Sequence, residues 1–230
     1  MTYLSQLILN PRSRQVRNEL ADPYEMHRAI CKAFPSSIFK ENEPSGILFR
    51  VDVPRTGIPT LLVQSKYEPN WAELTEARKN YLLDESYLPF GEENLALKEI
   101  DFSKKLRAGQ QLAFRLRANP TKRFSSGKGN KPGKRVGLYK EEEQFAWLKR
   151  KLSHEDSARL IAARIANQND LRGKLFVEKD KKKRMKFHAA LFEGILEITE
   201  KDEFQKMLIA GIGPGKGLGF GLLSLAPSRG

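Results

Sequence analysis

The sequence is poor in cysteine and has no long apolar run. Cys31 is the single cysteine among 230 residues, so no internal disulfide can form, and a reducing compartment, the cytosol, is expected. No apolar run approaches the roughly 18 residues that cross a bilayer, and the first residues lack the basic start of a signal peptide. The sequence therefore predicts a globular chain, of one large or two small domains, with no membrane partner.

Acidic residues are absent from a long central stretch. None occurs between Asp101 and Glu141, whereas the whole chain carries a net charge of +13. A second basic cluster, "KDKKKRMK", spans residues 179–186. Such runs are often solvated loops, but two clusters beside predicted strands favour a surface that binds nucleic acid. The candidate cations in these clusters are Lys122, Arg123, Lys128, Lys131, Lys181, Lys182, Lys183 and Arg184.

The first half of the chain predicts the order βαββαβ. Alternating apolar residues predict strands over 3–10, 46–53, 59–66 and 97–103, and helical periodicity predicts helices over 22–34 and 70–84. Asp22 is a good N-cap, Pro23 suits the first helical position, and Glu25 completes a capping box. For the second predicted helix, Asn70 is the expected cap.

The second half repeats this order. Strands are predicted over 110–119, 173–179, 184–198 and 220–225, and helices over 140–152, 153–168 and 199–211, the last two capped by Ser153 and Thr199. The motif Asn-Pro-x-x-Arg follows the first strand of each half, at residues 10–14 and 119–123. We therefore expect an α+β protein of two tandem ferredoxin-like domains, residues 1–105 and 109–230.

A glycine-rich stretch, "GIGPGKGLGFG", lies near the C-terminus. Its glycines are Gly211, Gly213, Gly215, Gly217, Gly219 and Gly221, and Lys216 lies among them. A Walker A loop would need a glycine where Ala210 stands and a hydroxyl residue where Gly217 stands, and no triple has the Rossmann spacing. No nucleotide cofactor is therefore expected. A bare backbone beside a lysine suits a polynucleotide backbone, and the alternative is a flexible connection into the last strand.

His27 is the candidate acid–base residue. It falls on the flank of the apolar stripe of the predicted helix 22–34, on the side of Tyr24, and Arg28 is next in sequence. The single cysteine and scattered histidines supply no zinc site, and no cluster of metal ligands is evident. RNA carries its own nucleophile, the 2′-hydroxyl, so one histidine can take its proton or protonate the leaving 5′-oxygen. By itself a histidine is more often structural or exposed: we expect His154 to be exposed and His188, in a predicted strand, to be packed or on the surface.

The chain resembles the CasE family, the CRISPR-RNA-processing endoribonucleases of the type I-E Cascade complex. The resemblance rests on "LILNPRSR", "ADPYEMHRAI", "FRLRANPTKR", "VGLYKEEEQFAWLKRKL", "FEGILEI" and "GIGPGKGLGFGLLSLAP", in this order over nearly the whole chain. It implies two ferredoxin-like domains and a metal-independent cut at the 3′ base of the CRISPR repeat stem-loop. The cut leaves a 2′,3′-cyclic phosphate and a 5′-hydroxyl, and the enzyme stays on its product as a Cascade subunit.

The resemblance also implies roles for particular residues. His27 would be the catalytic histidine, Tyr24 would assist it, and Arg28 would contact a backbone phosphate. The glycine-rich stretch with Lys216 would support the fold and contact RNA, and the basic hairpin around residues 179–186 would press against the RNA stem. Implied partners are the repeat RNA and other Cascade subunits, including the backbone subunit; no cofactor is implied, and the free protein would be a monomer.

Two other functions compete with an endoribonuclease. The chain could hold an RNA hairpin in a ribonucleoprotein without cutting it, or it could be a structural protein that binds duplex DNA. The first alternative predicts salt-sensitive hairpin binding without cleavage, and the second predicts duplex DNA binding at least as tight as RNA binding. The sequence does not decide whether His27 acts as the base or the acid.

Overall fold

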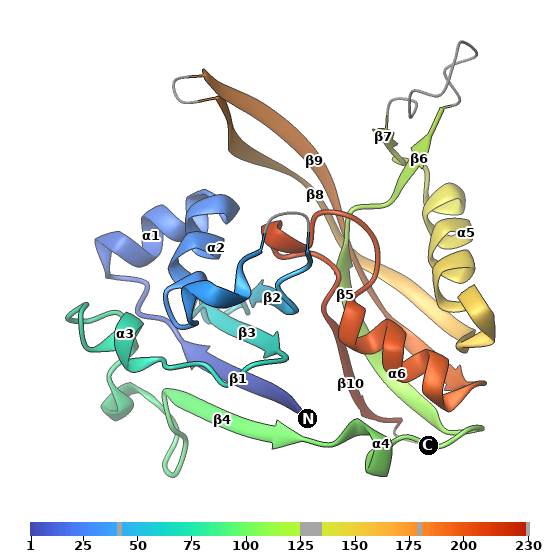
Figure 1. Ribbon diagram of the computed structural model, residues 1–230, viewed down its shortest axis with the longest axis horizontal. Coiled ribbons are helices and arrows are strands. Elements are labelled where there is room, and N and C mark those ends of the chain that lie inside the picture. Colours follow the sequence, from blue (N-terminus) through green and yellow to red (C-terminus); the bar gives the residue numbers. More distant parts are fainter. Residues whose placement is uncertain (41–42, 125–134, 179–180, 229–230) are drawn as a thin grey trace. The chain divides into compact units, whose positions relative to one another are not determined.

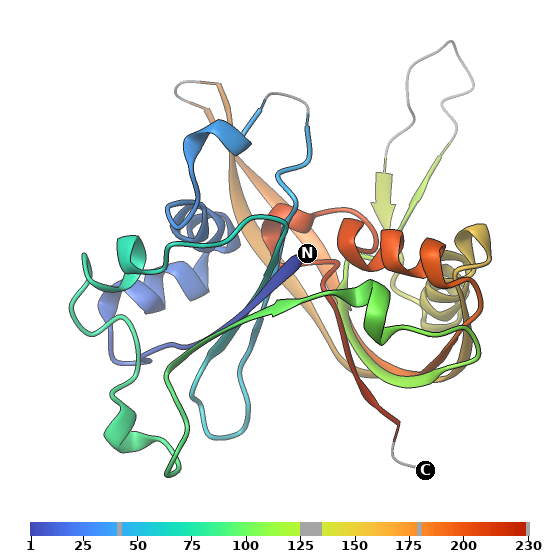
Figure 2. The ribbon, with the colours of Figure 1, turned by 60° about the horizontal axis from the view of Figure 1, so that its bottom comes forward.

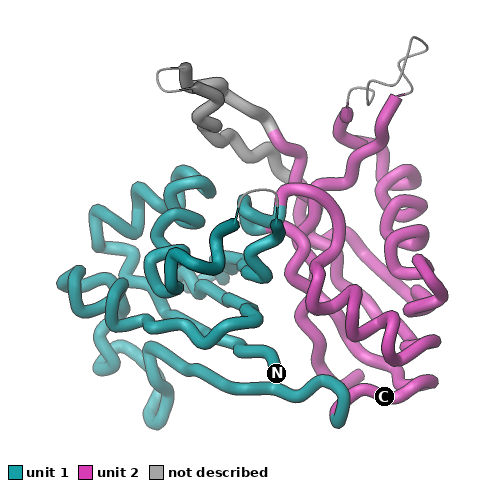
Figure 3. Tube along the Cα trace, in the orientation of Figure 1, with its two compact units in different colours: residues 1–104, 173–183, 216–219 teal, residues 105–172, 184–215, 220–230 magenta. Residues whose placement is uncertain are grey.

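The computed structural model describes residues 1–40, 43–124, 135–178 and 181–228, and gives only the backbone for residues 169–178 and 181–186. The chain divides into two compact units (Figure 3). Unit 1 comprises residues 1–104, 173–183 and 216–219, and unit 2 comprises residues 105–172, 184–215 and 220–230.

Unit 1 is built on a four-stranded antiparallel sheet in the order β2-β3-β1-β4. Its strands are β1 (Thr2–Ile8), β2 (Ile47–Asp52), β3 (Thr60–Ser65) and β4 (Leu95–Ile100). The register places Leu7 opposite Leu61 on β3 and Leu95 on β4. This strand order is that of a ferredoxin-like unit, as the sequence predicts.

The helices of unit 1 cover one face of this sheet (Figures 1 and 2). They are α1 (Arg14–Ala21), α2 (Pro23–Cys31) and the short α3 (Ala72–Thr75), with 3₁₀ turns η1 (Ser36–Ile38), η2 (Glu85–Tyr87) and η4 (Lys216–Leu218). Met26 and Ile30 of α2 pack with Leu7 of β1 and Phe49 of β2 in one apolar core. Burial of these side chains fixes α2 on the sheet, since each contributes about 1.5–3 kcal/mol.

Unit 2 repeats the sheet, with the order β10-β5-β9-β8. Its elements are α4 (Phe102–Lys105), β5 (Gln111–Ala118), β6 (Thr121–Arg123), β7 (Arg135–Gly137), α5 (Glu141–Leu152), η3 (His154–Asp156), β8 (Ala158–Glu178), β9 (Lys181–Ile198), α6 (Lys201–Ala210) and β10 (Leu223–Pro227). Residues 102–104 of α4, 173–178 of β8 and 181–183 of β9 are grouped with unit 1. Trp147 of α5 stacks with Phe192 of β9 at 6.4 Å between ring centroids, and Phe204 of α6 is fully buried. The predicted α+β fold with two ferredoxin-like units is thus confirmed.

The local predictions contain four errors: one helix was missed and three predictions were wrong. Helix α1 was not predicted, although Ser13 caps it by accepting from the backbone N–H of Val16. The helix predicted over 70–84 is only the four-residue α3, and Trp71 rather than Asn70 occupies its N-cap. Thr199 does not cap α6, whose N-cap residue is Glu200.

The fourth error is the helix predicted over 153–168. Ser153 makes no side-chain cap bond, the chain turns through positive φ at Glu155 and Asp156, and β8 then begins at Ala158. Alanine-rich "ARLIAARIA" has high helix propensity, but pairing with β9 in the sheet overrides it. Among the described residues, no helix is both long and apolar enough to cross a membrane.

Candidate active site

Helix α2 places the candidate catalytic side chains and starts where the sequence predicts. The Asp22 carboxylate accepts a hydrogen bond from the backbone N–H of Tyr24 at 3.1 Å, and Pro23 occupies the first turn. The Glu25 carboxylate pairs with Arg28 one turn later, at 3.0 Å. Because the cap and the buried face of α2 fix its start and its rotation, Tyr24, His27 and Arg28 have defined positions.

His27 is half-buried on α2, and its ring lies against the side chains of Phe49 and Cys31. One face stacks on Phe49 of β2, with 6.2 Å between centroids and 28° between planes. The Cys31 sulfur lies 3.7 Å from Nε2 and 3.9 Å from Nδ1. Burial lowers the pKa of His27 and raises the pKa of Cys31 to about 11. At neutral pH the imidazole is therefore uncharged and the thiol is protonated, so the ring can accept a proton.

The middle of the glycine-rich stretch belongs to the same unit as His27. Residues 216–219, which include η4, pack against α2 and β2. A Cβ built on Gly217 would lie 3.5 Å from His27 Nε2, and one on Gly219 would lie 3.1 Å from the Phe49 ring. Residues 216–219 therefore pack against the His27 imidazole and the Phe49 ring.

The predicted site residues are divided between the two units. Unit 1 contains Tyr24, His27, Arg28, Lys216, Gly217 and Gly219, whereas Gly211, Gly213, Gly215, Gly221, Lys122 and Arg123 belong to unit 2. Lys122 on β6 pairs with Glu143 at 2.9 Å and lies over the Phe124 ring, and Arg123 is exposed. Lys128 and Lys131 lie outside the described residues, and for Lys181, Lys182, Lys183 and Arg184 only the backbone of β9 is described.

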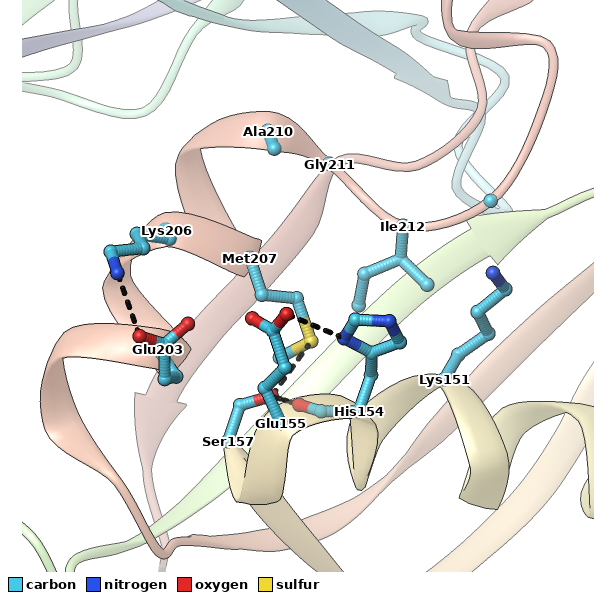
Figure 4. A pocket seen from close by; sticks show the side chains of 11 residues that line it. Lys151, His154, Glu155, Ser157, Glu203, Lys206, Met207, Ala210, Gly211 and Ile212 are labelled. Carbon is cyan, nitrogen blue, oxygen red and sulfur yellow. Dashed lines mark hydrogen bonds and ion pairs between the residues drawn. The ribbon is translucent and has the colours of Figure 1, made fainter.

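Gly211 and Gly213 line a separate cavity of about 300 Å³ within unit 2 (Figure 4). Its wall includes His154, Glu155 and Met207, and Glu203 accepts a hydrogen bond from Lys206 on α6. That lysine lowers the pKa of Glu203. The start and the middle of the glycine-rich stretch thus have different surroundings: residues 211 and 213 line this cavity, while residues 216–219 lie at His27.

Phe49 is the site residue that sequence reasoning missed. It lies in a strand whose apolar residues all read as core, and only the fold brings its ring beneath His27. Cys31 was also left out of the predicted site, although its place one helical turn after His27 could have identified it. No group of three or more His, Cys, Asp or Glu side chains placed to hold a metal ion occurs among the described residues.

Comparisons with known proteins identify the class of protein that carries this site. The family described as "CRISPR associated protein" matches residues 2–227. The chain is 37% identical over 234 residues to the CRISPR-associated endoribonuclease Cse3 of Thermus thermophilus, covering 98% of this chain and 100% of the relative. It is 30% identical over 233 residues to the CRISPR system Cascade subunit CasE of Escherichia coli K12, covering 98% and 99%.

The structural comparison agrees over the same length. A solved structure of CRISPR endoribonuclease Cse3 bound to 19 nt RNA superposes with a TM-score of 0.79 at 35% identity, covering 98% of this chain and all of the other. The chain belongs to the CasE/Cse3 family of CRISPR-associated endoribonucleases, as the motifs of its sequence indicate.

Proposed function

We propose that this protein is a metal-independent endoribonuclease that cuts precursor CRISPR RNA at the 3′ base of the repeat stem-loop. The observation that carries the proposal is His27, a neutral, half-buried imidazole held on a capped helix with the glycine segment 216–219 against it. Similarity over nearly the whole chain to an endoribonuclease, and to one solved with RNA bound, supports the substrate class.

The proposed reaction is an internal transesterification. The 2′-oxygen attacks the adjacent phosphorus, the bond from phosphorus to the 5′-oxygen breaks, and a 2′,3′-cyclic phosphate and a 5′-hydroxyl result. The 2′-hydroxyl loses one proton and the 5′-oxygen gains one, and His27 carries one of these two transfers. Tyr24 assists from the same helix, and Arg28 and Lys216 stabilise the charge that builds on the phosphate.

The rest of the RNA hairpin is bound through its shape and its phosphates, because the major groove of A-form RNA is too narrow for side chains to read. The proposed contacts are Lys122, Arg123, Lys128, Lys131, Lys181, Lys182, Lys183 and Arg184, together with the glycine-rich stretch 211–221. After the cut the protein, a monomer when free, remains on its product in the cytoplasm as a subunit of Cascade. Similarity to CasE supports this partner.

A cleavage assay tests this function. The protein is mixed with the repeat RNA of its own host in EDTA, and the product ends are analysed beside His27→Ala, with the exposed His154→Ala as the matched control. We expect one cut that ends in a 2′,3′-cyclic phosphate, slowed about 10²–10⁴-fold by His27→Ala and unchanged by His154→Ala.

Two results would contradict the proposal in different ways. Hairpin binding without any cut would leave a subunit that only holds RNA. A cut that persists in His27→Ala would show that another residue transfers the proton. A 2′-deoxy nucleotide at the scissile position should stop cleavage and spare binding, which separates RNA chemistry from general nucleic-acid binding.

A further inference from the structure

One segment of unit 1 is acidic, although the whole chain carries a net charge of +13. Residues 84–93, termed the acidic loop, contain no lysine or arginine and four acidic residues: Asp84, Glu85, Glu92 and Glu93. All four are exposed, and hydrogen bonds from Ser86 lower the pKa of Asp84, so it is charged at neutral pH. The acidic loop, which immediately precedes β4 (Figure 1), therefore presents a negative surface that repels RNA phosphates.

Two aromatic side chains of the acidic loop are exposed to solvent. Phe90 is 108% exposed and Tyr87 is 65% exposed, and among the described residues no large apolar side chain is more exposed than Phe90. Single exposed apolar residues are ordinary on a protein surface, but here two aromatic rings occur within four consecutive residues between pairs of acidic residues. Aromatic anchors surrounded by a polar rim are typical of surfaces that bind another protein.

Hydrogen bonds at its base give the acidic loop a defined shape. The Asn94 side chain donates to the carbonyl oxygen of Leu83 at 2.9 Å, and the backbone of Ile8 on β1 bonds to the backbone of both residues. Within the loop, the Asp84 side chain caps the 3₁₀ turn η2. A loop whose ends are tied together loses little conformational freedom on binding, so its aromatic side chains are already placed for a partner.

The charge of the acidic loop indicates the kind of partner. An apolar pocket would remove the two rings from water, and lysines and arginines around that pocket would pair with the carboxylates. We propose that the acidic loop is a protein-docking site, whose Tyr87 and Phe90 enter an apolar pocket with a basic rim on a neighbouring subunit of Cascade. This inference rests on the proposed function, which makes the protein a subunit of that complex. It gives the protein a second attachment to Cascade, independent of the RNA stem-loop.

Assembly on a CRISPR RNA without its stem-loop tests the inference. The other Cascade subunits of the same host are assembled on this trimmed RNA, so that the protein can join only through protein contacts. The double variant Tyr87→Ala, Phe90→Ala should bind this assembly about 30-fold more weakly than the wild type, the effect expected of buried aromatic anchors. It should keep the thermal midpoint, the hairpin affinity and the cleavage rate of the wild type.

The matched control is the double variant Phe39→Ala, Tyr67→Ala. It removes the same two kinds of side chain from unit 1, where Phe39 is 38% exposed and Tyr67 is 40% exposed, but neither residue belongs to the acidic loop. We expect this variant to bind the trimmed assembly as the wild type does.

A pair of charge variants tests the basic rim. Glu92→Gln with Glu93→Gln removes two charges from the acidic loop, whereas Glu73→Gln with Glu76→Gln removes two exposed charges elsewhere in unit 1. The first pair should slow association with the trimmed assembly about 3–10-fold at low salt, and less at high salt, because salt screens electrostatic attraction. The second pair should leave the association rate close to that of the wild type.

Four results would overturn the inference. They are equal binding of the wild type and the Tyr87→Ala, Phe90→Ala variant, no binding of the wild type to the trimmed assembly, weaker hairpin binding by this variant, and dimers of the free protein that this variant abolishes. The third result would assign the acidic loop to RNA, and the fourth would assign it to a second copy of the chain. Failure of the proposed cleavage is a separate outcome, since the wild type would then leave repeat RNA uncut while the trimmed assembly still tests the acidic loop.

Discussion

The two units share one strand order but differ in the segment that their first strand leads into. In unit 1, Asn10-Pro11 leads from β1 into α1 and α2, which carry His27. In unit 2, Asn119-Pro120 leads from β5 into the short strand β6, which carries Lys122 and Arg123. The same sheet thus supports a group that can transfer a proton in one unit and exposed cations in the other, so the chemistry lies in the connections.

The histidines show the same contrast. His188 of unit 2 is 7% exposed, its Nε2 lies 3.0 Å from the Gln144 side-chain nitrogen, and its ring lies 4.4 Å from that of Tyr139. His27 of unit 1 has a sulfur and a phenyl ring as its side-chain neighbours and faces a residue without a side chain. A histidine held by a buried polar partner serves the fold, whereas a half-buried one with apolar and thiol neighbours can serve a reaction.

Buried and exposed ion pairs give the largest predicted difference between the units. In unit 1, buried Glu19 accepts hydrogen bonds from Arg78 at 2.8 Å and from the Tyr81 hydroxyl at 2.7 Å. Glu19→Ala leaves the buried Tyr81 hydroxyl and the largely buried Arg78 guanidinium without this acceptor, and we expect it to lower the free energy of unfolding by about 3–5 kcal/mol. Urea unfolding of the full chain measures this loss.

The matched change in unit 2 is Glu193→Ala. Glu193 also pairs with two side chains, Arg115 and Arg164, but these are 43% and 77% exposed. Water and salt screen such pairs, so the expected cost is about 0–1 kcal/mol. Equal costs for the two substitutions would contradict the contrast between the units.

The sequence predicts most strands well because their signals are local, and an exception is the first part of β8, which was predicted as a helix. Gln111–Ala118 alternates buried and less buried residues along its whole length, and Asp22 caps α2 as expected. Helix α1 escaped detection because its buried residues are only Val16 and Glu19, and the glutamate reads as surface. Tertiary contacts that no local pattern contains, such as the one joining Glu19 to Tyr81, account for such failures.

The residues of the candidate site also differ in whether the sequence alone could identify them. His27 could be chosen from the helix start and the neighbouring Tyr24, which lie within a few residues of each other. Gly217 could be chosen as part of the glycine-rich stretch, whereas Phe49 beneath the His27 ring lies in a distant strand, so only the folded structure identifies it.

Replacing either His188 or His27 by alanine is expected to change stability by an amount between those of the other predictions. His188→Ala removes a buried polar contact and should cost about 1–3 kcal/mol of stability while RNA cleavage continues. His27→Ala should cost about 1 kcal/mol of stability and abolish most cleavage. Thermal unfolding and cleavage rates of the two variants, measured side by side, test the expected effects on stability and on cleavage. A loss of cleavage in a folded His188→Ala protein would contradict the division of roles.

The smallest predicted effect is the pH dependence that burial gives to His27. Burial lowers its pKa below the ordinary 6.5, so the unfolded chain binds more protons there than the folded chain. The contribution of His27 to stability is therefore full above pH 6.5 and is lost as the pH falls through the lowered pKa. Replacing His27 by alanine removes this dependence, so the stability difference between wild type and variant should change as the pH falls from about 7 to about 5. Chemical denaturation across that range measures the difference, and an NMR titration of His27 with a midpoint above 6.5 would reverse the sign.

The same NMR titration also bears on the role of His27 in cleavage. If His27 is the general base, its lowered pKa keeps the imidazole able to accept a proton at neutral pH. If His27 is the general acid, cleavage is lost as the pH rises through that lowered pKa.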